Sequence, residues 1–362
     1  MGAFDRGVSM NIQHLETPAL VVDRDILSAN RKAMQELLAG TSLALRPHYK
    51  SHKCAALAHV QVADGAKGMT CAKLSEAEDL ADSGIEDILI ANQIAEPGKI
   101  RRLVDLALKC RLTVCVDNGE NISALSAAAA NAGSTIHCLI EYDIGMERCG
   151  VTEAQQVLAL AQQIQKMPNL VFDGIQAYAG HISHVESMAQ RKEATACNAE
   201  KVRQVIALLN AHGIAVNTVS GGSTGTAQIK AMEGLYTELQ AGSYLFMDST
   251  YALLNTPFRN SLFILSTVVS VREGLAVLDS GVKTCGLDQG MPVPVGFTAE
   301  YIVASEEHFQ LHNPSKELKV GDKVLLIPGH CCSTVNLHDR IYLVEKDRVV
   351  DRLEITARKC GK

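Results

Sequence analysis

The sequence predicts a (β/α)8 barrel followed by a separate domain that consists mainly of β-strands. Eight short apolar segments alternate with stretches rich in Ala, Leu, Glu and Lys, and such an alternation is typical of parallel sheets. Eight strands within about 200 residues fit a closed barrel better than an open sheet. The eight segments are residues 43–45, 69–71, 88–91, 112–116, 136–140, 171–177, 218–219 and 236–239.

The pattern changes after the eighth segment. β-branched segments then follow one another without helical stretches between them, which predicts a β domain. These segments are residues 262–271, 275–279, 301–304, 323–328, 340–344 and 349–355. A strand at residues 18–23 precedes a helix at residues 25–38, and we expect this strand to pair with the β domain. The predicted domains are residues 24–254 for the barrel, and residues 10–23 with 255–362 for the β domain.

The composition, with 47% hydrophobic and 20% charged residues, is that of a soluble globular protein. A net charge of −6, 4% aromatic residues and the absence of Trp give no basis for binding nucleic acid or a membrane. No apolar run approaches the roughly 20 residues that span a bilayer, and residues 1–10 lack the apolar core of a signal peptide. The 11 cysteines show no disulfide pattern, which favours a reducing cytoplasm.

Residues 46–53, at the end of the first barrel segment, contain three cations and two imidazoles. Lys50 and His52 are two residues apart, so an extended segment would place them on one face. A lysine that is buried or crowded by other cations has a lowered pKa, and its free amine can attack a carbonyl. From the spacing alone, a basic and solvated strand end is the favoured interpretation.

Functional residues of a (β/α)8 barrel gather at the carboxyl ends of its strands. Residues 220–225 form a turn of glycines and small hydroxyl residues after a late strand, where backbone N–H groups can hold a phosphate; a plain turn fits equally well. A reactive lysine together with a phosphate site suggests pyridoxal 5′-phosphate (PLP), held as a Schiff base. Polar residues at other predicted strand ends are Asn92, Asp117, Asp143, Arg148, Tyr178, His181 and His184.

These motifs, with those at residues 17–21, 143–151, 176–178, 238–248 and 328–339, resemble the fold-type III (alanine racemase-like) PLP enzymes, and within them the D-threonine aldolase and D-serine dehydratase branch. The resemblance implies that Lys50 holds PLP and that Lys50, His184 and Arg148 are catalytic. It places Arg148 and Tyr178 near the cofactor, and it implies a homodimer with a small-molecule substrate. The residues that it assigns to the phosphate site are Gly222, Ser223, Thr224, Gly225, Gly242 and Ser243. Tyr244 belongs to the segment after the eighth strand that could supply further phosphate donors.

His330 and Cys332 would lie on one face of an extended segment and could provide half of a metal site. From periodicity alone, two buried cysteines beside a surface histidine is the favoured interpretation. The resemblance instead implies a divalent metal, since this branch carries a His-x-Asp or His-x-Cys pair at this position. Thiolate favours zinc, while manganese and magnesium stay open. Asp339 and His308 are candidates for a third ligand.

The branch implies a lyase that acts on D-3-hydroxy amino acids, with the metal binding the 3-hydroxyl group. The His-x-Cys form is associated with the dehydratases, whereas residues 333–339 and 236–248 look more like the aldolases. We therefore favour cleavage to glycine and an aldehyde over dehydration to a 2-oxo acid and ammonia. An amino acid racemase, a non-catalytic PLP-binding protein, and a PLP-free enzyme for a phosphorylated substrate, with Lys50 as general base, are further alternatives.

Overall fold

The computed structural model describes residues 10–360, which form two compact units. The barrel unit consists mainly of Gln35–Lys50 and Leu57–Gly242, and the β unit of Ser51–Ala56, Ser243–Arg358 and the described residues before Gln35. Ser51–Ala56 belongs to the β unit because its backbone is bonded there: the N–H of Ala357 donates to the carbonyl of Lys53 at 3.0 Å. The predicted domain boundaries at residues 24 and 254 stay a prediction.

The barrel unit contains all eight predicted strands, and they are parallel. The sheet order is β3-β10-β9-β8-β7-β6-β5-β4. A parallel bridge between His48 and Thr70 joins the chain after β3 to β4, and this contact closes the barrel. The strands are β3 (Ala44–Leu45), β4 (Met69–Cys71), β5 (Asp87–Ile90), β6 (Arg111–Val116), β7 (Ile136–Glu141), β8 (Leu170–Ala177), β9 (Thr218–Gly221) and β10 (Glu238–Leu239).

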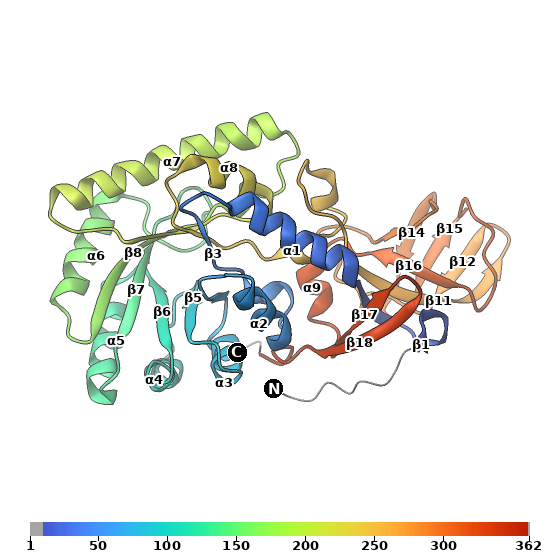
Figure 1. Ribbon diagram of the computed structural model, residues 1–362, viewed down its shortest axis with the longest axis horizontal. Helices are drawn as coiled ribbons and strands as arrows, with labels where there is room; N and C mark the ends of the chain where they lie inside the picture. Colours follow the sequence, from blue (N-terminus) through green and yellow to red (C-terminus); the bar gives the residue numbers. More distant parts are fainter. Residues whose placement is uncertain (1–9, 361–362) are drawn as a thin grey trace. The chain divides into compact units, whose positions relative to one another are not determined.

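Helices connect these strands, and those from α4 to α6 lie outside the sheet (Figure 1). Side-chain caps set where several of them begin: the Glu96 carboxylate accepts the N–H groups of Gly98 and Lys99 at 2.7 and 2.8 Å, and α4 follows. Within residues 10–360, every helix is too short or too polar to cross a lipid bilayer. The helices are α1 (Arg24–Leu38), α2 (Ala55–Ala63), α3 (Leu74–Asp82), α4 (Pro97–Leu106), α5 (Gly119–Ala132), α6 (Ala154–Lys166), α7 (Met188–Ala211) and α8 (Ala227–Glu233).

The β unit is organised around β2 (Ala19–Asp23), which pairs antiparallel with β11 (Leu262–Arg272) and parallel with β17 (Arg340–Glu345). The predicted pairing of the N-terminal strand with the β domain is therefore confirmed. Val21, Leu265 and Val344 from these three strands pack in one buried cluster. The remaining strands are β1 (Met10–Asn11), β12 (Leu275–Leu278), β13 (Val293–Pro294), β14 (Tyr301–Ala304), β15 (Phe309–His312), β16 (Lys323–Ile327) and β18 (Arg348–Glu354).

Three strands and one helix of this unit were not predicted. β1 and β13 are two residues long, and β15 alternates apolar with polar residues over only four positions, so their periodicity is weak. The helix is α9 (Cys331–Val335), where the sequence suggested an extended segment. The Asp248 carboxylate accepts the N–H of Cys331 at 3.0 Å, and the Thr334 hydroxyl donates to the carbonyl of His330 at 2.7 Å. The first contact joins residues 83 positions apart and exists only in the folded chain, the second is local, and both favour the helix.

Arg46 is a structural residue of the barrel, although it belongs to the same basic motif as Lys50. Its guanidinium donates to both oxygens of Glu238, at 2.9 and 3.1 Å, and to Asp87 at 2.9 Å. Lys67 lies 2.6 Å from the same Glu238 carboxylate. Asp87 and Glu238 are the first residues of β5 and β10, so this ion cluster lies at the amino end of the strands.

The cations of this cluster determine the pKa of Glu238. Burial alone would raise that pKa, but the charges and hydrogen bonds of Arg46 and Lys67 outweigh burial and lower it below the ordinary value of 4.5. Because the pKa is lower in the folded state, the carboxylate stabilises the fold above the unfolded pKa. This stabilisation is lost as the pH falls through the folded pKa.

We expect Glu238→Gln to lower the free energy of unfolding by about 3 kcal/mol at pH 7, since it removes one of the two carboxylates that pair with the buried Arg46. The variant should also lose less stability than the parent protein when the pH falls below about 4.5. Urea denaturation curves at pH values from 7 to 3 measure both effects.

Glu354→Gln is the matched control, because Glu354 is exposed and lies 3.8 and 3.6 Å from Arg340 and Arg352. Its change in the free energy of unfolding should stay within about 0.5 kcal/mol. Equal losses in the two variants would contradict a special role of the buried cluster.

Candidate active site

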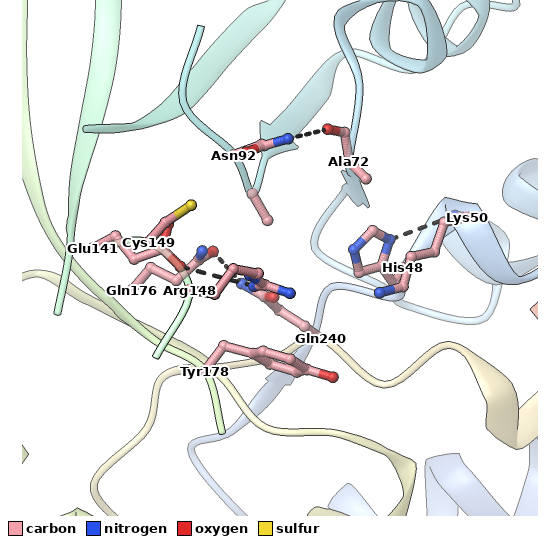
Figure 2. A pocket seen from close by; sticks show the side chains of 11 residues that line it. His48, Lys50, Ala72, Asn92, Glu141, Arg148, Cys149, Gln176, Tyr178 and Gln240 are labelled. Atoms are coloured by element: carbon pink, nitrogen blue, oxygen red, sulfur yellow. Dashed lines mark hydrogen bonds and ion pairs between the residues drawn. The ribbon is translucent and has the colours of Figure 1, made fainter. Parts of the chain in front are cut away.

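A pocket opens at the carboxyl ends of the barrel strands, and it brings together Lys50, Arg148 and Tyr178. It encloses about 580 Å³ of space, part of it open to solvent. Lys50 points into it beside His48, while Arg148, Tyr178 and Gln240 lie on the other side (Figure 2). The lining residues are His48, Lys50, Ala72, Ala91, Asn92, Glu141, Arg148, Cys149, Gln176, Tyr178 and Gln240.

Lys50 lies in a 3-10 turn, η2 (Tyr49–Ser51), and not in the extended segment that the sequence suggested. The turn follows from a buried anchor: the hydroxyl of the fully buried Tyr49 donates to Asp79 of α3 at 2.5 Å. Lys50 and His52 therefore do not share a face, and the expectation that they do is wrong. The imidazole that lines the pocket with Lys50 is His48, and the ring nitrogen of His52 instead accepts the N–H of Cys54 at 3.2 Å.

Arg148 is carried by a loop that folds back on the end of β7. The Asp143 carboxylate accepts three backbone N–H groups at its start, from Gly145, Met146 and Glu147, at 2.8, 2.7 and 2.9 Å. Asp117 accepts the N–H of Gly150 at 2.9 Å, just beyond Arg148. Asp117 and Asp143 were noted as polar strand ends, and their observed contacts make them supports of this loop.

The guanidinium of Arg148 faces two neighbours in the pocket. It lies 5.8 Å above the ring of Tyr178, a distance at which a cation is attracted to an aromatic face. Its Nη2 atom lies 4.0 Å from the Glu141 carboxylate. The positive charge of Arg148 in the pocket therefore lies over an aromatic ring on one side and near a buried carboxylate on another.

Glu141, Gln176 and Gln240 form a buried polar chain at this pocket that the sequence analysis did not identify. Gln93 donates to Glu141 at 2.6 Å, and the Gln240 amide donates to Gln176 at 2.8 Å and to Ser220 at 3.0 Å. Burial raises the pKa of Glu141 in spite of its hydrogen bonds and the charge of Arg148. The only indication of this chain in the sequence was a polar residue at each strand end, and many polar residues at such positions are simply exposed to solvent.

The glycine-rich turn after β9 is buried, and its backbone conformation requires glycine at one position. Gly222 has a φ of +74°, and a Cβ there would lie 2.8 Å from a methyl group of Leu239, so only glycine fits. The hydroxyl of Thr224 is buried, and the described residues provide no hydrogen-bond partner for it. Such a group is rare in a folded protein, and an anion bound at this turn would supply the missing acceptor.

The second predicted phosphate loop follows β10 and lies next to the first. The N–H of Gln240 donates to the carbonyl of Gly221 at 2.9 Å, so residues after β10 run beside the glycine-rich turn, and Gly242 is two residues further on. Ser243 and Tyr244 begin the short 3-10 turn η5 (Ser243–Leu245). Tyr244 packs against Phe258, with ring centroids 5.6 Å apart.

His184 lies on the turn between η3 (Gly180–Ile182) and α7. The fully buried Arg191 of α7 holds this turn, because its guanidinium donates to the backbone carbonyls of Val185 and Glu186. Within residues 10–360, the lining of the Lys50 pocket includes neither His184 nor residues 222–225 and 242–244.

His330 is the N-cap residue of α9, and Cys332 follows in its first turn. Although the extended geometry was wrong, the two side chains do meet, since the Cys332 thiol hydrogen-bonds to the His330 imidazole. Burial would lower the pKa of His330, but Cys332 and Asp288 outweigh it and raise the pKa to about 9. An imidazole and a thiol in contact are a donor set that suits a divalent metal.

Neither candidate for a third metal ligand lies with His330 and Cys332. In residues 10–360 no group of three or more His, Cys, Asp or Glu side chains could hold a metal. Asp339 forms an ion pair with Arg358 and does not join His330 and Cys332 in such a group, and neither does His308. A metal bound by His330 and Cys332 would therefore keep open positions for water or substrate.

Comparisons with known proteins identify the class. Residues 22–250 match the family "Alanine racemase, N-terminal domain", and residues 261–344 match the "Putative serine dehydratase domain". The chain belongs to the alanine racemase N-terminal domain family and is a fold-type III PLP enzyme. The predicted (β/α)8 barrel with a β domain, and the predicted PLP-dependent lyase, are confirmed.

Individual relatives narrow the class further. The chain is 39% identical to a D-threonine aldolase of Arthrobacter sp. (96% of this chain, 94% of the relative) and 38% identical to a 3-hydroxy-D-aspartate aldolase of Paracoccus denitrificans (97% and 94%). The crystal structure of D-threonine aldolase from Filomicrobium marinum is similar, with a TM-score of 0.95, 37% identity, and 98% and 99% of the two chains covered. A D-threo-3-hydroxyaspartate dehydratase mutant in the metal-free form has a TM-score of 0.84, 26% identity, and 95% and 98% coverage.

We expect Thr224→Val to weaken PLP binding about tenfold, because it removes a hydroxyl that we assign to the phosphate. The same change should leave the thermal midpoint of the cofactor-free protein unchanged or raise it, since it removes a buried polar group without a partner. Absorbance titrations with PLP and thermal melts of the cofactor-free protein measure the two effects.

Thr195→Val is the matched control. Thr195 is also fully buried, but its hydroxyl donates to the carbonyl of Arg191 at 2.7 Å. This variant should lose about 1 kcal/mol of stability and keep its PLP affinity. Unchanged PLP affinity in Thr224→Val would remove Thr224 from the phosphate site.

Proposed function

We propose that this protein cleaves D-3-hydroxy amino acids to glycine and an aldehyde, as a D-threonine aldolase-type lyase that uses PLP and a divalent metal. The observation that carries the proposal is the pocket in which Lys50 lies with Arg148 and Tyr178 at the carboxyl ends of the barrel strands. Two relatives at 39% and 38% identity over nearly the whole chain are aldolases of this kind, which supports the reaction type.

Lys50 is the residue that binds the cofactor covalently in this proposal, since its amine faces the pocket. The turn of Gly222, Ser223, Thr224 and Gly225 binds the phosphate, with Gly242, Ser243 and Tyr244 as further members of the phosphate site. The bound cofactor supplies an electron sink for cleavage of a bond at Cα. The buried Thr224 hydroxyl supports this assignment, because it lacks a partner among the described residues.

Arg148 holds a positive charge beside the reacting groups. Asp143 and Asp117 fix the backbone of its loop, and Tyr178 lies beside the guanidinium with its ring centroid 5.8 Å away. A fixed guanidinium pairs well with an anionic oxygen of the substrate or cofactor. Tyr178 also gives the pocket an apolar wall.

His184 is the base that accepts the proton of the substrate's 3-hydroxyl group in this proposal. A histidine suits this role because its ordinary pKa lies near neutral pH. The buried Arg191 supports the assignment, since it fixes the turn that carries His184 through two backbone carbonyls.

His330 and Cys332 hold the divalent metal in this proposal, and the metal supplies Lewis acidity for an oxygen group. The contact between imidazole and thiol supports a metal, and so does the dehydratase relative whose mutant structure is a metal-free form. The thiolate favours zinc on softness, and manganese or magnesium would bind it less well.

A dehydratase is the second candidate, and Cys332 is the observation that favours it. Residues 261–344, which include the His330 and Cys332 pair, match the domain described for serine dehydratases. Such an enzyme would release ammonia and a 2-oxo acid from D-serine or D-3-hydroxyaspartate. The two reactions differ in whether a base takes the hydroxyl proton or the hydroxyl group leaves.

We also propose a cytoplasmic homodimer. All 11 cysteines lie within the described residues and are unbridged, which supports a reducing compartment. The dimer follows from the family resemblance.

We expect the purified PLP-loaded protein to release glycine and an aldehyde from D-threonine and from D-threo-3-hydroxyaspartate. EDTA should abolish this activity, and a divalent metal should restore it. Chromatography of the amino acid products together with an aldehyde assay measures the reaction, with D-serine as the third substrate. Ammonia and a 2-oxo acid as the products would assign a dehydratase instead.

We expect Lys50→Ala to lower activity at least about 1,000-fold and to lose the bond that borohydride fixes between PLP and protein. His330→Ala should lower metal-restored activity by about 100-fold without changing that bond. His308→Ala, which removes an exposed histidine of the same unit, is the control and should keep full activity. Full activity in His330→Ala would contradict the metal assignment.

A further inference from the structure

Asp288 is the acidic residue in contact with His330, 42 positions away along the chain. Its Oδ2 atom lies 2.6 Å from Nδ1 of the imidazole. Its other oxygen, Oδ1, accepts a hydrogen bond from the hydroxyl of Ser333 at 2.5 Å. Both carboxylate oxygens are therefore engaged by donors of the protein, one from the candidate metal ligand and one from the first turn of α9.

The segment that carries Asp288 is held against α9 and the residues just after it by two contacts that precede Asp288 in the chain. The N–H of Gly286 donates to the hydroxyl of Thr334 at 3.1 Å, and the ring of His338 bonds to the carbonyl of Thr284 at 2.8 Å. A side chain at residue 286 would overlap with Ser333, so the close approach requires glycine. The position of the carboxylate is thus set by several contacts and does not depend on a single flexible side chain.

We propose that Asp288 is a positioning residue that orients His330 for metal binding, an inference that rests on the metal site of the proposed function. Nδ1–H of the imidazole donates to Asp288, which fixes the ring plane and leaves Nε2 as the nitrogen that a metal can take. Carboxylates that hold metal-binding histidines in this way raise the affinity of the site. Ser333 in turn fixes the carboxylate.

The geometry assigns Asp288 the role of support and not that of a third ligand. A carboxylate that ligates a metal needs an oxygen directed at it, whereas both oxygens of Asp288 are used by His330 and Ser333. The absence of any metal-binding group of three His, Cys, Asp or Glu side chains within residues 10–360 agrees with this assignment.

The test is the zinc affinity of PLP-loaded protein, measured by competition with a chromogenic chelator after removal of bound metal with EDTA. We expect Asp288→Ala to weaken zinc binding by about 10- to 100-fold. Asp288→Asn keeps an oxygen that can accept from Nδ1–H, so its affinity should recover to within about fivefold of the parent protein. Ser333→Ala should weaken zinc binding by less than Asp288→Ala does.

Glu307→Gln is the matched control for the loss of a negative charge, because Glu307 is an exposed carboxylate of the same unit, paired with Lys283 at 2.7 Å. It should bind zinc like the parent protein. The thermal midpoint of each metal-free variant is measured alongside. It separates a loss of zinc affinity that is caused by unfolding from one that is caused by a misoriented His330.

Unchanged zinc affinity in Asp288→Ala, with affinity lost in His330→Ala, would overturn the positioning role and leave the metal site standing. If Asp288→Asn binds zinc as weakly as Asp288→Ala does, the positioning role would also be overturned, since loss of the negative charge would then explain the weaker binding. If the parent protein binds zinc no better than His330→Ala, the proposed metal site itself is wrong.

Discussion

The closure of the barrel at β3 is the constraint on which the site depends. β3 has only two residues in its ladder, and the chain reaches β4 through the single bridge between His48 and Thr70. Arg46, buried between these two contacts, binds the first residues of β5 and β10. Because Lys50 follows within the same short stretch, the interactions that close the barrel also fix where the lysine enters the pocket.

The two ends of the barrel use buried glutamates in opposite ways. Glu238 at the amino end is surrounded by Arg46 and Lys67, and its pKa is lowered, as is usual for a structural ion pair. Glu141 at the carboxyl end has amides around it and Arg148 only at 4.0 Å, so burial dominates and its pKa is raised. The cations that pair with Glu238 stabilise the fold. Glu141 has no cation at such close range among the described residues, so polar groups stay available in the pocket.

In the β unit, the surrounding residues hold an imidazole and a thiol in contact at the start of a short helix. α9 is only five residues long, and its first turn is held by Asp248 and by the Thr334 hydroxyl. Asp288 and Ser333 then hold the ring of His330. A short helix that is stabilised by side chains around it can be specific in geometry although its own propensity is weak.

The sequence by itself determined the alternation of strands and helices and the stretch that carries Lys50, because local periodicity and motifs encode both. It also indicated that the first strand belongs with the β domain, but the partner strands β11 and β17 came from the structure. Tertiary structure decided what local patterns do not contain. The turn at Lys50 depends on Tyr49 reaching Asp79, and the helix at Cys331 depends on Asp248. The surroundings of Glu141 and Asp288 are set by hydrogen-bond partners that are far away in the sequence. Sequence spacing does not encode such contacts, since they exist only once the chain has closed upon itself.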